Sequence, residues 1–376
     1  MKRFISLFLV VVSFGWVQTV RAADIQVMTQ NQYLGADLAP VFNAPSPAAF
    51  NEAAVAALQQ IAASKPAKRI KALAAEIAKA GPALVGLQEV DLFQCTNLAP
   101  PTAGLGCDDE SIREAFVDHL QDTLSALGGL YAAAAVVTNL SVGVPLSING
   151  FPVLVAAVDR DVILARSDIP ATPVDFSGVC QKPSAQGCNY SVVLPVTLPF
   201  NPPITINVER GFVAVDAKVK GNAYRFVTTH LEEKLPGTAA APIQAAQAAE
   251  LIQVLQATTP QGRSLLVVGD TNSSPVDPPI FGSIPTPYMQ FAATGYTDAW
   301  LLRPGKVPGL TCCQLEDLSN HNSVLYERVD MIFSLDPLAG VKQARLVGAT
   351  VSDKTPPPGR GLWPSDHGAV TGELQF

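Results

Sequence analysis

Apolar and polar positions follow helical spacing in two stretches near the start of the chain. Residues 65–82 carry apolar side chains three and four positions apart, with Ser64 as a candidate N-cap and Gly81 as a stop signal. Residues 111–127 repeat this spacing and end before Gly128. The pattern therefore predicts one helix in each stretch.

Short apolar runs predict buried strands after and between these helices. Two pairs of runs are joined by hairpin signals, at Asn149-Gly150 and Gly221-Asn222, and a further helix opens near Pro242. Because strands and helices interleave while hairpins are frequent, we expect an α/β protein with mixed rather than purely parallel sheets. Two such sheets packed face to face, with helices outside, satisfy this pattern.

Several of the predicted strands end or begin at residues that carry chemistry. The run "ALVGLQEV" ends at Glu89, "YRFVTTH" at His230 and "SLLVVGD" at Asp270. In α/β proteins ligand groups gather beyond strand ends, so residues far apart in sequence can converge there. The remaining candidates follow or precede other strands and are Asn272, Asp330, Asp366 and His367.

These residue types suit one kind of reaction. Carboxylate and amide oxygens are the hard ligands that Mg²⁺ or Mn²⁺ accepts. Two histidines beside carboxylates can move protons near neutral pH. A hard cation with proton carriers predicts hydrolysis at phosphorus. Each residue alone also fits a solvated strand end or an Asx turn, and only their combination favours a site.

The N-terminus predicts export. Lys2 and Arg3 precede an apolar run, and Ala22 supplies the small residue before the cleavage point of a signal peptide spanning residues 1–22. We expect residues 23–376 to form one domain with a β-rich insertion at about residues 132–210, because no repeat or flexible linker divides it. The expected location is secreted or periplasmic.

Composition narrows the function classes. The chain has 376 residues, of which 48% are hydrophobic and 15% charged, which favours a large core and argues against disorder. The formal net charge of −7 provides no basic surface for holding a polyanion through many phosphate contacts.

Six cysteines in an exported protein predict disulfides. The simplest pairs are local, namely Cys95 with Cys107, Cys180 with Cys188, and Cys312 with its neighbour Cys313. The last pair could form a vicinal bridge or remain reduced. Zinc binding is disfavoured because neither Cys-x-x-Cys spacing nor a nearby histidine supports it.

The motifs together resemble the endonuclease/exonuclease/phosphatase superfamily, which includes pancreatic deoxyribonuclease. The matching pieces, in the family's order, are "MTQNQYLG", "LVGLQEV", "VTTHLEE", "VVGDTNSSP", "ERVDMIF" and "WPSDHGAV". They span Met28 to Val370, and the set is specific although each piece alone is weak. The resemblance implies a deoxyribonuclease I-like four-layer sandwich of two mixed β-sheets flanked by helices.

The resemblance also implies residue roles on the cation side of a site. Glu89 would be the principal metal ligand, and Asn31 would orient the metal or a phosphate oxygen. Asp366 would be a further metal or orienting group. The implied cofactor is Mg²⁺, with Mn²⁺ as an alternative, and one or two ions remain open.

The implied catalytic residues act on water and phosphate. His367 would be the general base, while His230 would be a hydrogen-bond donor or acid toward the phosphate. Asp270 and Asn272 would position the attacking water and a phosphoryl oxygen. Asp330 would hold one imidazole or contribute to the metal site. The other two histidines receive no such role: His119 is expected at a helix surface or edge, and His321 in a polar loop.

The implied activity is in-line hydrolysis of a phosphodiester by an exported enzyme that acts as a monomer. Inositol polyphosphate phosphatases are disfavoured because "GDTNSSP" and "ERVDMIF" lack that subfamily's motif forms, and abasic-site enzymes because they are intracellular. An extracellular nuclease and a sphingomyelinase-like phospholipid phosphodiesterase stay open. The apolar hairpin at Asn149-Gly150 could meet lipid, although a flap or core edge is favoured because its tip lacks an aromatic anchor. An inactive phosphate-binding module is the non-enzyme alternative.

Overall fold

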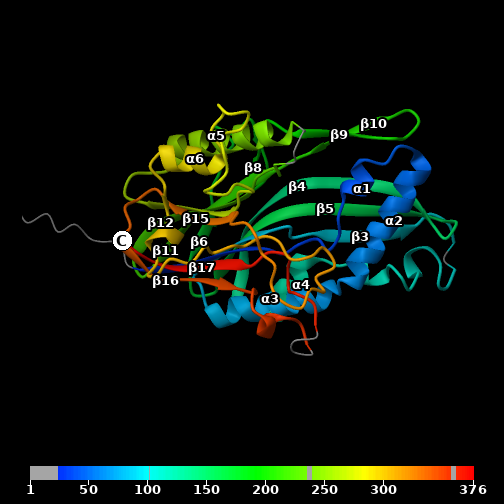
Figure 1. Ribbon diagram of the computed structural model, residues 1–376, viewed down its shortest axis with the longest axis horizontal. Helices are drawn as coiled ribbons and strands as arrows, with labels where there is room; N and C mark the ends of the chain where they lie inside the picture. The colour runs from blue at the N-terminus through cyan, green and yellow to red at the C-terminus, as the bar shows by residue number, and fades with distance from the viewer. Residues whose placement is uncertain (1–23, 101, 235–238, 357–360) are drawn as a thin grey trace, which may run out of the picture.

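The computed structural model describes residues 24–100, 102–234, 239–356 and 361–376, and these form four layers (Figure 1). Helices α3 and α4 lie against one sheet, and α5 and α6 lie against the other, on the opposite side of the molecule. This is the predicted α/β sandwich of two mixed sheets, and that fold prediction is confirmed. The predicted signal peptide, residues 1–22, lies outside the described residues.

The first sheet has seven strands in the described part of the chain, in the order β16-β17-β1-β2-β5-β3, with β4 paired to β5. Its central strands β1 and β2 run parallel, whereas β17 and β5 flank them antiparallel. The strands of this sheet are β1 (Ile25–Asn31), β2 (Leu84–Gln88), β3 (Leu92–Asn97), β4 (Tyr131–Ile148), β5 (Phe151–Arg166), β16 (Gly340–Val347) and β17 (Ala369–Gln375).

The second sheet has eight described strands, in the order β14-β15-β13-β12-β11-β8-β7, with β6 paired to β11. Here β12 and β13 are the parallel pair, and β15 and β11 flank them antiparallel. Its strands are β6 (Ala171–Pro173), β7 (Lys182–Pro183), β8 (Gly187–Asn189), β11 (Gly211–Val219), β12 (Asn222–His230), β13 (Ser264–Asp270), β14 (Thr297–Asp298) and β15 (Asp330–Ser334). A separate hairpin joins β9 (Leu194–Leu198) to β10 (Ile204–Val208).

The helices are amphipathic or apolar and bury their contact faces on the sheets. Helices α1 and α2 cover the far half of the long β4–β5 hairpin, beside β9 and β10 (Figure 1). The helices are α1 (Ala39–Phe42), α2 (Pro47–Ala63), α3 (Pro66–Ala80), α4 (His119–Leu127), α5 (Ala240–Thr258) and α6 (Pro287–Ala293), with 3-10 turns at Gly106–Asp108, Arg113–Ala115, Ala299–Leu302 and Val351–Asp353.

The two sheets pack closely where the functional residues emerge. Gly86 of β2 lies so near β12 that an added Cβ would come within 2.4 Å of the Thr228 hydroxyl oxygen, so only glycine fits there. Beside it, Gln88 donates to that same hydroxyl at 2.7 Å across the interface. Apolar side chains such as Val27, Leu84 and Phe226 fill the rest of this space.

Strand direction brings the candidate residues to one edge of both sheets. The parallel pair β1 and β2 ends at Asn31 and Gln88, and the parallel pair β12 and β13 ends at His230 and Asp270. The antiparallel neighbour β15 begins at Asp330, directly opposite Asp270. Because parallel strands end where their antiparallel neighbours begin, all these positions share one edge.

Two of the helix predictions are partly wrong. The predicted helix at residues 111–127 is α-helical only from His119, because the Asp118 carboxylate caps it there by accepting from the backbone N–H groups of Leu120 and Gln121. Ser64 does not cap α3. Instead it ends α2, where its hydroxyl donates to the Ile61 carbonyl, and Lys65 precedes α3.

The predicted hairpins are present, and apolar side chains next to the exposed turn of the longer one are buried. Ile148 pairs with Phe151 across the Asn149-Gly150 turn. The apolar side chains of this hairpin, including Leu146 and Val153, are buried against α2 and its neighbours. The structure therefore favours the core-edge interpretation over a surface that meets lipid.

The structure contains the local disulfides expected from the sequence, and the Cys312–Cys313 pair, which the sequence left open, is also bridged. Cys95 pairs with Cys107, Cys180 with Cys188, and Cys312 with Cys313 as a vicinal bridge. Within the described residues no cysteine is left free. The first bridge joins β3 to the 3-10 turn at Gly106–Asp108, the second closes a loop of the β-rich region, and the third lies at the functional edge.

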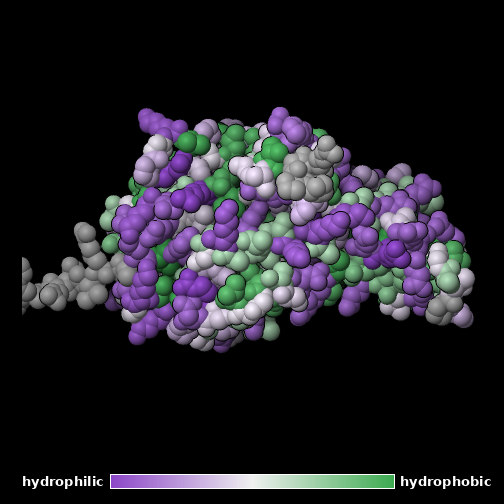
Figure 2. Space-filling view, turned by 90° about the horizontal axis from the view of Figure 1, so that it is seen from below, coloured by the Kyte–Doolittle hydropathy of each residue, from purple (hydrophilic) through white to green (hydrophobic). Residues whose placement is uncertain are grey.

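The outer surface mixes polar and apolar side chains. Figure 2 shows hydrophilic residues spread over the whole face seen there, with smaller hydrophobic areas between them. Scattered apolar residues on such a face are normal for folded proteins. Among the described helices, none combines the length and the apolar character needed to cross a membrane.

Candidate active site

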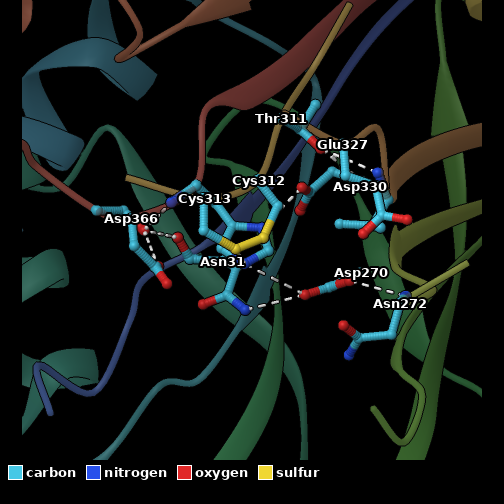
Figure 3. The surroundings of a disulfide bond; sticks show 12 residues. Asn31, Asp270, Asn272, Thr311, Cys312, Cys313, Glu327, Asp330 and Asp366 are labelled. Carbon is cyan, nitrogen blue, oxygen red and sulfur yellow. Dashed lines mark hydrogen bonds and ion pairs between the residues drawn. A yellow bond between two sulfur atoms is a disulfide. The ribbon is translucent and has the colours of Figure 1, made fainter. Parts of the chain in front are cut away.

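The amide of Asn31 connects two carboxylates at the functional edge. Its side-chain nitrogen donates to Glu89 Oε1 at 3.0 Å. The same nitrogen donates to Asp270 Oδ2 at 3.2 Å, and this bond joins the two sheets (Figure 3). Its oxygen accepts the backbone N–H of Tyr33 at 2.9 Å. Asn31 therefore orients both carboxylates as a donor, while its own oxygen is already engaged.

His367 is held by a carboxylate on the neighbouring sheet. Its Nδ1 lies 2.8 Å from Asp330 Oδ2, and its Nε2 lies 3.7 Å from Asp270 Oδ2. A carboxylate can only accept, so Nδ1 carries a proton and Nε2 faces Asp270. This geometry is that of a base oriented by an acid.

His230 faces the same carboxylate from β12. Its Nε2 lies 3.5 Å from Asp270 Oδ2 and 3.1 Å from the side-chain nitrogen of Asn272. Its Nδ1 lies 3.0 Å from Nη1 of Arg210. Two imidazoles thus flank one carboxylate, each through its Nε2.

Two site residues adopt backbone conformations that non-glycine residues rarely take. Glu89 has φ of 51° and Asn272 has φ of 48°. Such left-handed positions cost free energy and persist where the surroundings fix them. At Glu89 the carboxylate accepts the Leu34 backbone N–H at 2.9 Å, and at Asn272 the backbone N–H donates to Asp270 at 2.9 Å. Both bends turn these residues back into the cluster.

Unbalanced negative charge gathers on the carboxylates of the cluster. Burial and then the nearby Asp366 carboxylate raise the pKa of Glu89 to about 7. Burial also raises the pKa of Asp366, opposed by His367 and Arg69 and reinforced by Asp270. The pKa of Asp270 is raised by burial too, with His367 opposing and Asp330 adding to the shift. A bound cation would relieve this repulsion.

The same carboxylates act on His367. Burial works to lower the pKa of His367, but Asp330, Asp366 and Asp270 outweigh it and hold the pKa well above its usual range. Positive charge is therefore favoured at this end of the cluster, whether it comes from a proton or from a cation.

The residues present fit a hard divalent cation. The carboxylate of Asp366 lies close enough to that of Glu89 to raise the pKa of Glu89. Both side chains therefore offer oxygen, the ligand atom that Mg²⁺ and Mn²⁺ prefer. The trio of Asp270, Asp330 and His367 also lies within metal-binding range. Within that trio, the 2.8 Å contact between His367 Nδ1 and Asp330 Oδ2 fixes the orientation of the imidazole ring.

The vicinal disulfide lies next to the imidazole of His367. Cys313 Sγ is 3.9 Å from His367 Nε2, and Figure 3 shows the bridge among Asn31, Asp366 and Asp330. The Thr311 hydroxyl accepts the backbone N–H groups of Val329 and Asp330, which fixes this segment beside β15. Both sulfurs are in a disulfide, so they are not the thiolates that would bind zinc with His367.

Two buried residues to which the sequence analysis gave no role in the site support the backbone around the cluster. Arg69 of α3 is 0% exposed and donates to the backbone carbonyls of Gln32, Tyr33 and Pro364 at 3.0, 3.0 and 3.1 Å. It therefore ties the loop after β1 to the loop that carries Asp366 and His367. No pattern in the sequence distinguishes Arg69 from the lysines beside it.

His119 is the second of these residues, and its predicted surface position is wrong. It is 0% exposed, its backbone N–H donates to the Asp91 carbonyl at 2.9 Å, and its Nδ1 lies 3.3 Å from the Glu89 carbonyl. His119 thus supports the backbone of the Glu89 turn. Its place just after the N-cap Asp118 puts it under the strand end rather than in solvent.

The other residues singled out from the sequence lie where they were expected. The cluster connects all eight predicted catalytic and metal residues through contacts or charge interactions, and their roles stay predictions. His321 is exposed in its loop. The eight residues are Asn31, Glu89, His230, Asp270, Asn272, Asp330, Asp366 and His367.

No protein-family model matches the chain, and no curated protein matches it by sequence. Solved structures resemble it. An endonuclease/exonuclease/phosphatase family protein from Bacteroides thetaiotaomicron is 16% identical with a TM-score of 0.51, and the match covers 94% of this chain and 98% of that one. A second endonuclease/exonuclease/phosphatase protein, from Beutenbergia cavernae DSM 12333, is 18% identical with a TM-score of 0.49, covering 94% and 72%. A mannosyl-6-phosphatase from Bacteroides thetaiotaomicron VPI-5482 is 15% identical with a TM-score of 0.49, covering 94% and 100%.

The first of these likenesses spans nearly the whole of both chains and shows a shared fold. It agrees with the two mixed sheets flanked by helices described above. The resemblance inferred from the motifs is confirmed at this level: the chain has the fold of the endonuclease/exonuclease/phosphatase superfamily.

Proposed function

We propose that the protein is a metal-dependent phosphodiesterase that uses a histidine-activated water. The observation that carries this proposal is the placing of His230 Nε2 and His367 Nε2 at 3.5 and 3.7 Å from the same Asp270 oxygen. Asn31 links that carboxylate to Glu89. A phosphate next to Asp270 would touch both imidazoles and the cation ligands together.

His367 is the proposed general base. Asp330 keeps the proton on Nδ1, and a cation bound at the carboxylates would offset the negative charge that raises the pKa of His367, so that the lone pair of Nε2 could accept a proton from water. The water oxygen forms a bond to phosphorus as the bond to the leaving oxygen breaks, and the proton of the water passes to His367. Asp270 and Asn272 position the water and a phosphoryl oxygen.

Glu89, which accepts a hydrogen bond from Asn31, and Asp366 are the proposed ligands of Mg²⁺ or Mn²⁺. Such an ion polarises the phosphoryl oxygens and offsets the charge that develops on them. Every group that the motifs predict is present in the cluster, which argues against the inactive binding module.

The proposed substrate class is a phosphodiester. The packing of the chain disfavours contact between the Asn149-Gly150 hairpin and lipid. Near the hairpin tip at Asn149-Gly150, Leu146, Ile148 and Val153 are buried against α2 and its neighbours, which leaves few apolar side chains for a membrane anchor. The net charge of −7 disfavours tight holding of a long polyanion away from the cation. Export of the protein and a monomeric state remain part of the proposal.

Turnover with and without metal tests this function. Residues 23–376 would be incubated with bis-p-nitrophenyl phosphate, plasmid DNA and sphingomyelin vesicles, each with Mg²⁺ and with a chelator. We expect hydrolysis of at least the small diester, abolished by the chelator and restored by added Mg²⁺. The monoester p-nitrophenyl phosphate serves as the control that distinguishes a diesterase from a monoesterase.

Each outcome of this panel has a clear meaning. Cleavage of DNA favours the nuclease and cleavage of sphingomyelin favours the phospholipid enzyme. Turnover that the chelator leaves unchanged contradicts the metal requirement. Absence of turnover on every phosphoester contradicts the proposal and supports a binding module.

A further inference from the structure

Arg210 contacts the imidazole of His230 from the side away from the cluster. Its Nη1 lies 3.0 Å from His230 Nδ1, and His230 itself is only 2% exposed. Two carboxylates hold the guanidinium in place, Asp159 at 3.8 Å and Glu232 at 3.6 Å. Burial opposes the charge of Arg210, but Glu232 and Asp159 keep its pKa above the usual range, so it stays protonated.

The chemistry of a guanidinium fixes which nitrogen of His230 carries the proton. Every nitrogen of arginine donates and none accepts, so His230 Nδ1 must accept and is bare. A neutral imidazole keeps one proton, which therefore lies on Nε2. The protonated imidazolium is excluded as well, because it would place an N–H against the N–H of Arg210.

The contact between Asn272 and His230 favours the opposite tautomer, so the strengths of the hydrogen bonds from Asn272 and from Arg210 must be compared. Its side-chain nitrogen is 3.1 Å from His230 Nε2, which would suit an accepting Nε2. One amide proton of Asn272 is used by the Leu231 carbonyl at 3.0 Å, and the Asp270 carboxylate, with its Oδ2 3.5 Å from Nε2, favours a proton on that nitrogen. A hydrogen bond from a charged donor contributes more than one between neutral groups, so the bond from Arg210 determines the tautomer.

The groups facing His230 from other elements favour the same state. Asp161 of β5 lies beside the His230 backbone, Asp270 of β13 faces Nε2, and His367 approaches from before β17. Burial, then Arg210 and then His367 hold the pKa of His230 well below its usual range. The neutral ring with its proton on Nε2 agrees with all of these contacts.

We propose that Arg210 is a positioning residue that fixes His230 in its Nε2-protonated tautomer, so that His230 offers a hydrogen bond to a phosphoryl oxygen and not a proton to the leaving group. The phosphoryl part of this inference rests on the proposed function, whereas the tautomer does not. Loss of the Nε2 proton would leave an imidazolate, so the leaving oxygen takes its proton from solvent.

The two site histidines then have opposite tautomers and opposite roles. In its neutral form His367 keeps its proton on Nδ1, bonded to Asp330, and presents a lone pair on Nε2, whereas neutral His230 presents an N–H there. His119 provides an internal reference, because its Nδ1 faces the Glu89 carbonyl, which can only accept. One protein thus contains buried histidines of both kinds.

Nuclear magnetic resonance of the histidine rings tests the tautomer directly. Residues 23–376, labelled with ¹⁵N and studied with Mg²⁺, would be examined by long-range ¹H–¹⁵N correlation, with each ring assigned from a His→Gln variant. We expect a protonated Nε2 and a bare Nδ1 for His230, and the reverse for His119. A proton on Nδ1 of His230 in the unaltered protein overturns the proposal without any need for a variant.

Substitutions at Arg210 test whether this residue is the cause. Arg210→Lys keeps a group that only donates and should preserve the tautomer, while Arg210→Met should remove the preference for Nε2. Arg160→Met is the matched control, since Arg160 is a similarly buried arginine that bonds to Asp118 and backbone carbonyls rather than to a histidine. An unchanged His230 tautomer in Arg210→Met would overturn the role of Arg210.

Turnover links the tautomer to function. For bis-p-nitrophenyl phosphate we expect Arg210→Met to lower kcat by about 10-fold to 100-fold, the cost typical of losing a residue that orients a site group, and Arg210→Lys to restore part of it. Equal kcat in Arg210→Met and the unaltered protein would contradict a role in the reaction. If the unaltered protein hydrolyses nothing, the proposed function fails while the ring spectra still decide the tautomer.

Discussion

Replacing His367 by alanine should lower phosphodiester turnover by about 10²–10⁴, the range that a general base contributes. The reason is geometric: His367 Nε2 is the acceptor that faces Asp270, and Asp330 holds its other nitrogen at 2.8 Å. Initial rates on bis-p-nitrophenyl phosphate with Mg²⁺ would measure the effect. Circular dichroism and the melting temperature would show whether the fold persists.

His321→Ala is the control for this experiment, because His321 is an exposed histidine in a loop of the same region. It should retain full turnover. A His367→Ala protein that is folded and as active as the control would remove His367 from the mechanism. His367→Gln provides a second variant, since a glutamine could still bond to Asp330 and so guards against loss of folding.

Arg69→Met should destabilise the protein by about 3–5 kcal/mol, since each buried acceptor left without its donor costs about 1–3 kcal/mol. The substitution leaves three backbone carbonyls without their donor, and Asp366 loses a cation that lowers its pKa. Chemical denaturation followed by circular dichroism would give the change in the free energy of unfolding. Methionine keeps much of the side-chain volume, so the loss reports mainly on the guanidinium.

Lys71→Met on the same helix is the matched control, because Lys71 is exposed and its loss should change stability by no more than about 0.5 kcal/mol. Equal stabilities of the two variants would show that Arg69 does not hold the loops together. One of these loops directly follows Asn31, the last residue of β1, and the other carries Asp366 and His367.

The strand ends of this site could be predicted from sequence because a periodic signal stops there. The apolar runs before Glu89, His230 and Asp270 are strands, and strand direction alone brings their last residues to one edge. The local disulfides could be predicted for a similar reason, since their cysteines are close in sequence. These features depend on local pattern and on chain direction.

The supporting side chains could not be predicted, because their function depends on contacts between distant segments. Arg210 and Arg69 look like any surface arginine until the fold places one against His230 and the other under two loops. Some local signals were available and were missed. Asp118 is a regular N-cap, and Ser46 followed by Pro47 marks the start of α2, which the apolar pattern of this alanine-rich stretch did not reveal.

The central claim is that Glu89, Asp366 and Asn31 define a cation site facing the two imidazoles. Crystals of residues 23–376 soaked in Mn²⁺ test it through the anomalous scattering of the ion. We expect a peak about 2.1 Å from a carboxylate oxygen of Glu89, and no peak there in crystals of Glu89→Gln. A peak only elsewhere on the molecule, or an unchanged peak in Glu89→Gln, would contradict it.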